Sequence, residues 1–162
     1  MTQYQVEKTL HLASKREYEL KIEQKAYEIQ LGVLEPFRAI CIGSGIVLPL
    51  IAGFTLLSKP VFFGGNWEII SGSLSLVAAI LTGIHTGFNC DTYQGEARRL
   101  SKALQSLVAN YQYVQTVDQS QLEIQFNELE TRLKDLRHSS DIRVARWCTR
   151  QAKREVDLEQ KP

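Results

Sequence analysis

The chain has 162 residues, and its 19 Lys and Arg residues nearly balance its 18 Asp and Glu residues. This length predicts one domain, and the near-neutral charge argues against a strongly basic nucleic-acid-binding protein. Three cysteines, Cys41, Cys90 and Cys148, are an odd number at wide spacing, which predicts neither a disulfide framework nor a zinc site. We expect small buried or lipid-facing thiols and no nucleic-acid partner.

The N-terminal segment is rich in Glu, Lys, Gln, Leu and Ala and contains no proline before Pro36. These residues favour helix, so residues 1–37 are predicted to form an N-terminal helix. We expect the helix to end near Pro36, because proline removes a backbone donor and usually breaks a helix.

Two runs without Asp, Glu, Lys or Arg follow, at residues 39–58 and 69–90. About 20 helical residues at a rise of ~1.5 Å each cross a hydrocarbon layer of ~30 Å. The short connection between the runs is rich in glycine and proline, so the two helices should be antiparallel neighbours. Residues 38–90 are therefore predicted to be a transmembrane hairpin, the alternative being a pair of buried helices in a soluble bundle.

Basic residues lie beside the outer ends of both runs: Lys21, Lys25, Arg38, Arg98, Arg99 and Lys102. The connection contains Lys59 as its one basic residue. Cytoplasmic segments carry the excess of Lys and Arg, so both termini are predicted to be cytoplasmic.

Small and polar residues gather on one side of the second run when it is drawn as a helix: Ser71, Ser75, Ala78, Thr82, His85, Thr86 and Asn89. Larger apolar residues lie opposite: Leu74, Val77, Ile80, Leu81, Ile84 and Phe88. Gly83 and Gly87 form a G-x-x-x-G pattern, and Gly45 lies on the small face of the first run. Such a stripe should face protein or water, since lipid satisfies no polar group. It predicts either helix packing or the lining of a pore formed by several copies.

The last segment, residues 91–162, is predicted to be helical and cytoplasmic. Ser120 and Glu123 have the spacing of a capping box, which predicts the start of a second helix there. Apolar residues then recur in steps of three and four: Leu122, Phe126, Leu129, Leu133 and Leu136. This heptad spacing is typical of a coiled-coil seam, and we expect it to assemble copies of the chain.

No motif for phosphate, dinucleotide or zinc-protease chemistry is present. The three histidines, His11, His85 and His138, lie in three different segments. We therefore predict no catalytic, cofactor-binding or metal-binding residues and no enzyme activity, and no cofactor. With catalysis set aside, we expect a function in binding, assembly or permeation.

The order of these features resembles the SLATT family of bacterial two-transmembrane proteins and related domains of unknown function. The likeness covers about residues 20–150. It rests on Lys25-Ala26-Tyr27, on Val47-Leu48-Pro49 in the first run, on the amphipathic helix from Tyr93 to Tyr111, and on a helix that is expected to end near Trp147.

The residue patterns, with no strand pattern among them, predict an all-α membrane protein whose long cytoplasmic helices form a bundle, and the resemblance implies a location in the bacterial inner membrane. It implies a homo-oligomer in contact with membrane lipid, a pore-forming or channel-like effector of a defence system, triggered by a sensor or nucleotide-signal partner protein. The alternative function is a membrane-anchored scaffold without permeation activity.

Overall fold

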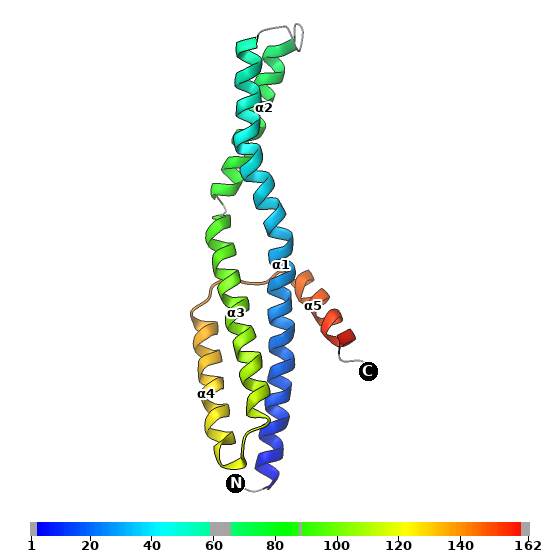
Figure 1. Ribbon diagram of the computed structural model, residues 1–162, viewed down its shortest axis with the longest axis vertical. Coiled ribbons are helices and arrows are strands. Elements are labelled where there is room, and N and C mark those ends of the chain that lie inside the picture. Colours follow the sequence, from blue (N-terminus) through cyan, green and yellow to red (C-terminus); the bar gives the residue numbers. More distant parts are fainter. Residues whose placement is uncertain (1–2, 59–65, 88, 160–162) are drawn as a thin grey trace. The chain divides into compact units, whose positions relative to one another are not determined.

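A computed structural model describes residues 3–58, 66–87 and 89–159, with the side chains of 55–58 and 67 outside the description. The expected all-α class is confirmed for these residues, which contain five helices and no strand (Figure 1). The helices are α1 Gln3–Ser58, α2 Trp67–Gly87, α3 Cys90–Val114, α4 Gln119–His138 and α5 Arg146–Glu159. Residues 59–65 of the predicted connection, and Phe88 of the second run, lie outside the described residues.

The predicted break at Pro36 is wrong, because α1 continues through both Pro36 and Pro49. A proline inside a helix removes one hydrogen bond, to the carbonyl four residues earlier, and here those residues are Gly32 and Gly45. The rest of the backbone ladder carries the helix past each proline. The predicted capping box is also wrong, since α4 begins after Asp118 and no side chain caps it.

The chain divides into two compact units. Residues 1–32 and 94–162 form the bundle unit, and residues 33–93 form the hairpin unit. The N-terminal and C-terminal segments therefore contribute to the same unit. Helix α1 belongs to the bundle unit up to residue 32 and to the hairpin unit from residue 33.

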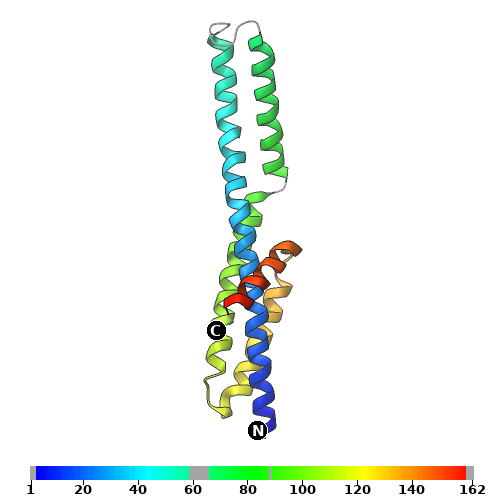
Figure 2. The same ribbon diagram turned by 90° about the vertical axis from the view of Figure 1, so that its right-hand side faces the viewer.

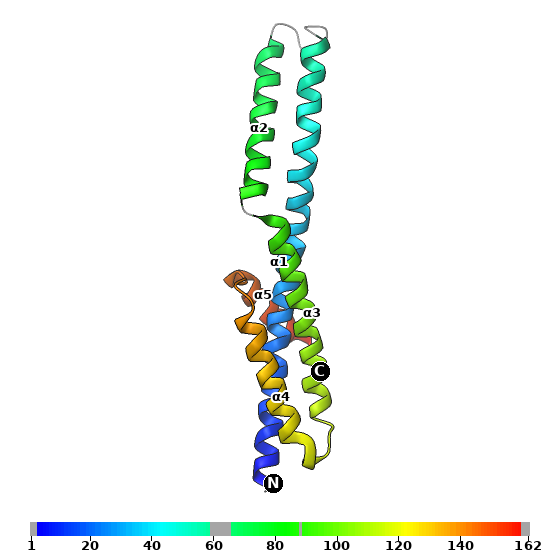
Figure 3. The ribbon, with the colours of Figure 1, turned by 90° about the vertical axis from the view of Figure 1, so that its left-hand side faces the viewer.

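In the bundle unit, α1, α3 and α4 lie side by side (Figures 1 and 3). The α1 side chains that face the core recur every seven residues: Val6, Ala13, Leu20 and Tyr27. Those of α3 recur in steps of three and four: Ala97, Leu100, Leu104, Leu107, Tyr111 and Val114. Matching heptad periods on neighbouring helices are what knobs-into-holes packing requires, so one apolar core runs between the three helices.

Helix α5 crosses α1 on another side of the bundle unit (Figure 2). Its small buried residues Cys148 and Ala152 pack against Ala26 of α1. The segment before α5 is fixed to α1 by two hydrogen bonds. Tyr27 Oη donates to the Ile142 carbonyl at 3.2 Å, and the Ala145 amide donates to Gln30 Oε1 at 3.1 Å.

In the hairpin unit, α2 runs antiparallel to α1 (Figures 2 and 3). The covered residues of α1 alternate in steps of four and three: Leu34, Arg38, Cys41, Gly45, Leu48 and Ala52. Those of α2 alternate likewise: Ser71, Leu74, Ala78, Leu81 and His85. The two rows form the hairpin seam, which combines small residues with leucines and lets the helices approach closely.

Asn89 joins α2 to α3 with a backbone φ of 46°, in the left-handed region. Asparagine tolerates this region better than most residues. Its amide donates to the Thr86 carbonyl at 3.2 Å, and its carbonyl accepts from the Tyr93 amide at 3.0 Å. The turn therefore ends α2 and begins α3, whose first residue is Cys90, directly before Asp91.

Candidate functional site

The predicted small and polar stripe of α2 is divided by the hairpin seam. Ser71 and Ala78 are buried against α1, and His85 is half-buried there. The remaining stripe residues are exposed: Ser75, Thr82, Thr86 and Asn89. Leu74 and Leu81, which we expected on the opposite side, are half-buried in the seam. The seam is rotated toward these leucines because they fill the space between two helices that otherwise meet through small residues.

This rotation leaves a second face of α2 uncovered. Five of its residues follow the helix in steps of three and four: Gly72, Ser75, Ala79, Thr82 and Thr86. Gly83 lies beside them, and all six are exposed. We call this row the small polar face. Among the described residues, the Thr82 and Thr86 hydroxyls have no hydrogen-bond partner, whereas buried Ser71 donates to the Glu68 carbonyl at 3.1 Å. The exposed hydroxyls therefore remain free to bind another chain or water.

The other exposed side of α2 is apolar apart from Ser73, which is exposed there and interrupts the pattern. It carries Ile69, Leu76, Val77, Ile80 and Ile84. The outward side of α1 in the same unit is apolar as well, with Ile40, Ile46, Val47, Leu50 and Phe54 exposed. The hairpin unit thus has two kinds of outer surface, a broad aliphatic one and the narrow small polar face.

The three glycines expected in helix packing differ in what surrounds them. A Cβ atom on Gly45 would lie 2.9 Å from Thr82 Oγ1, so Gly45 is a close contact of the seam. A Cβ atom on Gly83 or Gly87 would meet nothing within 4 Å. Within the described chain these two glycines pack against nothing, and a packing role for them would need another chain.

A charged cluster closes one end of the hairpin unit. Arg38 of α1 forms an ion pair through Nε with Asp91 Oδ1, and His85 Nε2 lies 3.4 Å from Asp91 Oδ2. His85 Nδ1 is buried without a hydrogen-bond partner in the described residues. Sequence analysis identified His85 but not its partners, although Arg38 and Asp91 immediately flank the two uncharged runs and so had to meet when the runs paired.

The predicted seam of α4 is covered inside the bundle unit. Leu122, Leu129 and Leu133 are buried, Phe126 and Leu136 are half-buried, and the Phe126 ring contacts Tyr111 of α3 edge-on with centroids 6.1 Å apart. In the structure, other helices of the same chain's bundle unit cover this seam. Its role between copies stays a prediction.

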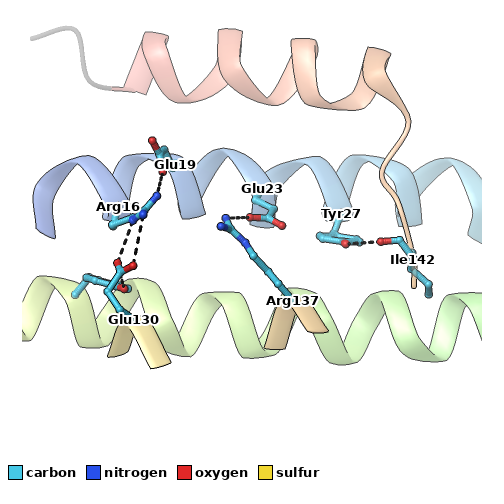
Figure 4. A network of polar contacts seen from close by, with 8 residues as sticks. Arg16, Glu19, Glu23, Tyr27, Glu130, Arg137 and Ile142 are labelled. Atoms are coloured by element: carbon cyan, nitrogen blue, oxygen red, sulfur yellow. Dashed lines mark hydrogen bonds and ion pairs between the residues drawn. The ribbon is translucent and has the colours of Figure 1, made fainter. Parts of the chain in front are cut away.

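A polar network crosses this core and joins three helices. Arg16 of α1 donates from Nε to Glu130 Oε1 of α4 at 3.0 Å and from Nη1 to Glu19 at 2.8 Å (Figure 4). Tyr111 of α3 donates its hydroxyl to the same Glu130 oxygen at 2.9 Å. Burial, and then this bond to Glu130, raise the pKa of Tyr111, while the bonds to Glu19 and Glu130 raise the pKa of Arg16.

A second network joins α1 and α3. The Glu17 carboxylate accepts hydrogen bonds of 2.7 Å from Gln112 and from Gln115 of α3, and it pairs with Lys21 at 2.7 Å. Burial acts to raise the pKa of Glu17, but the bonds from Lys21, Gln112 and Gln115 outweigh it, so the pKa lies below its ordinary value. Sequence spacing alone had not indicated either network.

Reactive and metal-binding groups are sparse in the described part of the chain. No three His, Cys, Asp or Glu side chains there lie close enough to hold a metal ion. Burial raises the pKa of the Cys148 thiol, which disfavours the reactive thiolate. The arrangement offers surfaces for packing and binding, and its one unusual surface in the hairpin unit is the small polar face.

The chain matches no model of a protein family, no curated protein and no solved structure. The likeness to the SLATT family therefore rests on the order of sequence features alone.

Proposed function

We propose that the chain is an oligomeric membrane protein whose copies together form a path for ions or small solutes. The hairpin unit spans the membrane, and the small polar face of α2 is directed toward the axis shared by the copies. The bundle unit lies in the cytoplasm with both termini. The resemblance to SLATT proteins adds the setting, which is a bacterial inner-membrane effector that a sensor or nucleotide-signal partner protein triggers during defence.

Membrane insertion is supported by length, composition and burial together. Two helices are long and apolar enough to cross a membrane, and in each the most apolar window is only 11% buried. A core helix of a soluble protein would be mostly buried. Here Leu50, at 67% exposure, and Ile80, at 52%, face outward from the hairpin. Side chains of this kind gain most by contact with lipid, because water around them is unfavourable.

The observation that carries the proposal is the uncovered small polar face. Moving a hydroxyl from water into hydrocarbon without a hydrogen-bond partner costs several kcal/mol. Mutational data in proteins give a smaller cost, about 1–3 kcal/mol. The hairpin seam leaves Ser75, Thr82 and Thr86 outside, although it has room for Ser71 and Ala78. Within the described chain these hydroxyls do not bond back to their own helix as Ser71 does, and one hairpin alone cannot enclose water, so we infer that neighbouring copies or a water-filled path between them satisfy these groups.

Leakage from liposomes that contain the purified protein tests the proposal. Thr82→Leu places a bulky apolar side chain on the small polar face, so dewetting should reduce leakage while the mass of the detergent-solubilised oligomer stays constant. Ile84→Phe, on the opposite side of α2, is the matched control and should leave leakage unchanged.

Two results would contradict the proposal, the first its permeation activity and the second the facing of α2. Loss of the oligomer in Thr82→Leu, without leakage from the wild type, would make the face a packing surface of a membrane-anchored scaffold. Loss of leakage in Ile84→Phe but not in Thr82→Leu or His85→Phe would mean that the opposite side of α2 lines the path.

The orientation has its own test in intact cells. A cysteine introduced at Asn66, an exposed residue just before α2, should react with a membrane-impermeant thiol reagent added outside. Reaction only after lysis would place the connection in the cytoplasm and both termini outside.

A further inference from the structure

Helix α5 has a narrow inner face and a broad outer one. Cys148, Ala152 and Val156 are buried against the bundle unit. The outer face carries exposed residues, of which four follow in steps of three and four with Gln151 beside them: Trp147, Arg150, Arg154 and Leu158. We call this row the α5 outer face.

The charges of α5 are divided between the two faces. Residues 146–154 contain four basic residues, Arg146, Arg150, Lys153 and Arg154, and no acidic one. Two acidic residues of the helix instead contact α1. Glu155 pairs with Lys25 of α1 at 3.5 Å, and Asp157 accepts a hydrogen bond from Tyr18 of α1.

None of the four basic side chains has a hydrogen bond or ion pair within the described residues, and all four are exposed. Two other exposed arginines of the bundle unit are paired, Arg137 with Glu23 at 3.1 Å and Arg132 with Glu128 at 2.6 Å, whereas exposed Arg99 of α3 has no partner among the described residues. The positive charge of α5 is therefore left for something outside the chain.

Trp147 lies in the same row and is 47% exposed, and Leu158 at the other end is 67% exposed. Tryptophan and arginine are the residue types that most often carry the binding energy of protein interfaces. Two arginines four residues apart, between two apolar side chains, match a helix that presents carboxylates with the same spacing beside an apolar groove.

We propose that the α5 outer face is a docking surface for an acidic helical segment of a partner protein. Arg150 and Arg154 pair with its carboxylates, and Trp147 and Leu158 pack on its apolar residues. This surface belongs to the bundle unit, so its test does not depend on permeation.

The test uses the full-length protein in detergent with Trp67 replaced by Phe, which leaves Trp147 as the sole tryptophan. Trp67→Tyr is a second form if the first does not fold. The probe is a synthetic amphipathic helical peptide with an all-glutamate polar face, and a lysine-for-glutamate peptide is its counterpart. The glutamate peptide should shift Trp147 emission to shorter wavelength in a saturable, salt-sensitive manner.

Charge reversal provides the matched comparison. Arg150→Glu with Arg154→Glu should weaken binding of the glutamate peptide roughly tenfold or more, which corresponds to ~1.4 kcal/mol. The same doubly reversed protein should bind the lysine peptide. Arg132→Glu, an exposed reversal on α4, should leave both affinities unchanged.

Three outcomes would overturn the proposal. The first is that the glutamate peptide binds no better than the lysine peptide. The second is that the glutamate peptide binds the doubly reversed protein as tightly as it binds the parent. In the third, vesicles with anionic lipid, or a single-stranded oligonucleotide, shift Trp147 emission at lower concentration than the peptide does.

Discussion

Gly45 of α1 approaches α2 so closely that a Cβ atom on it would lie 2.9 Å from Thr82 Oγ1. Thr82 is nevertheless exposed, because its side chain stands at the edge of the hairpin seam, where the seam gives way to the small polar face. This one contact connects the packing of the hairpin with the surface proposed to line the path. A substitution at Gly45 therefore acts on both.

We expect Gly45→Ala to destabilise the hairpin unit, typically by about 1–3 kcal/mol for an overpacked site. Thr82 is β-branched and has few alternative rotamers in a helix, so it gives way poorly. Gly43→Ala is the control, since a Cβ atom there meets nothing within 4 Å, and it should stabilise by up to ~1 kcal/mol through helix propensity. Denaturant titration of helicity in micelles measures both, and Thr82→Ala should relieve the effect of Gly45→Ala.

Removal of the Glu130 carboxylate should destabilise the bundle unit. Glu130→Ala leaves Arg16 and Tyr111 without their shared acceptor, and hydrogen bonds to charged groups contribute about 1.5–3 kcal/mol. Tyr111→Phe removes only one of these bonds and should lower stability by ~1 kcal/mol. Glu128→Ala, which breaks an exposed i,i+4 pair with Arg132, should change stability by less than ~0.5 kcal/mol. Equal effects of Glu130→Ala and Glu128→Ala in chemical denaturation would show that the network adds nothing.

Glu17 makes the stability of the bundle unit depend on acidity. Its pKa in the folded chain lies below the ordinary value of 4.5, because its bonds from Lys21, Gln112 and Gln115 outweigh burial. A lowered folded-state pKa stabilises the fold above pH 4.5, and this stability is lost as the pH falls through the folded-state pKa. Glu17→Gln should therefore be less stable than the parent at pH 7, by on the order of 1 kcal/mol, and the difference should shrink by pH 3. A difference that stays constant with pH would contradict the assigned cause.

The apolar core of the bundle unit is tested at α4. Leu129, at 5% exposure, lies in the core, and Leu129→Ala should lower the unfolding free energy by about 2–5 kcal/mol. Ile124 on the same helix is 70% exposed, so Ile124→Ala should have little effect. Thermal unfolding distinguishes the two. A loss of oligomer mass in Leu129→Ala, with the thermal transition unchanged, would instead support the seam predicted between copies.

Heptad spacing was the part of the fold most readable from the sequence. The steps of three and four from Leu122 to Leu136 predicted a buried row, and the structure buries Leu122, Leu129 and Leu133 of it and half-buries the other two. What the spacing leaves open is the partner, because the same row packs equally well on another helix of its own chain or of a second copy. The structure places it in the chain's own bundle.

Local rules were less reliable where tertiary packing opposes them. Pro36 should have ended a helix, since an interior proline costs about 3 kcal/mol or more, but α1 packs in both units before and after it, and this packing offsets the loss. The stripe of α2 was identified by residue type, yet a helical wheel cannot say which edge of a stripe the neighbour covers. Leu74 and Leu81 decide this by filling the seam. The networks at Glu130 and Glu17 contain bonds across 114 and 95 positions, Arg16 to Glu130 and Gln112 to Glu17, and contacts at such separations leave no periodic signal.

The central claim is that the small polar face of α2 borders water within a membrane, and cysteine accessibility measures this most directly. In a protein without its three natural cysteines, Thr82→Cys and Ile80→Cys are compared in liposomes with a charged thiol reagent that does not enter lipid. The account predicts that Thr82→Cys reacts and that its modification blocks leakage, while Ile80→Cys, on the aliphatic side, stays unmodified. Rapid modification of Ile80→Cys together with an inert Thr82→Cys in a leaking protein would contradict it.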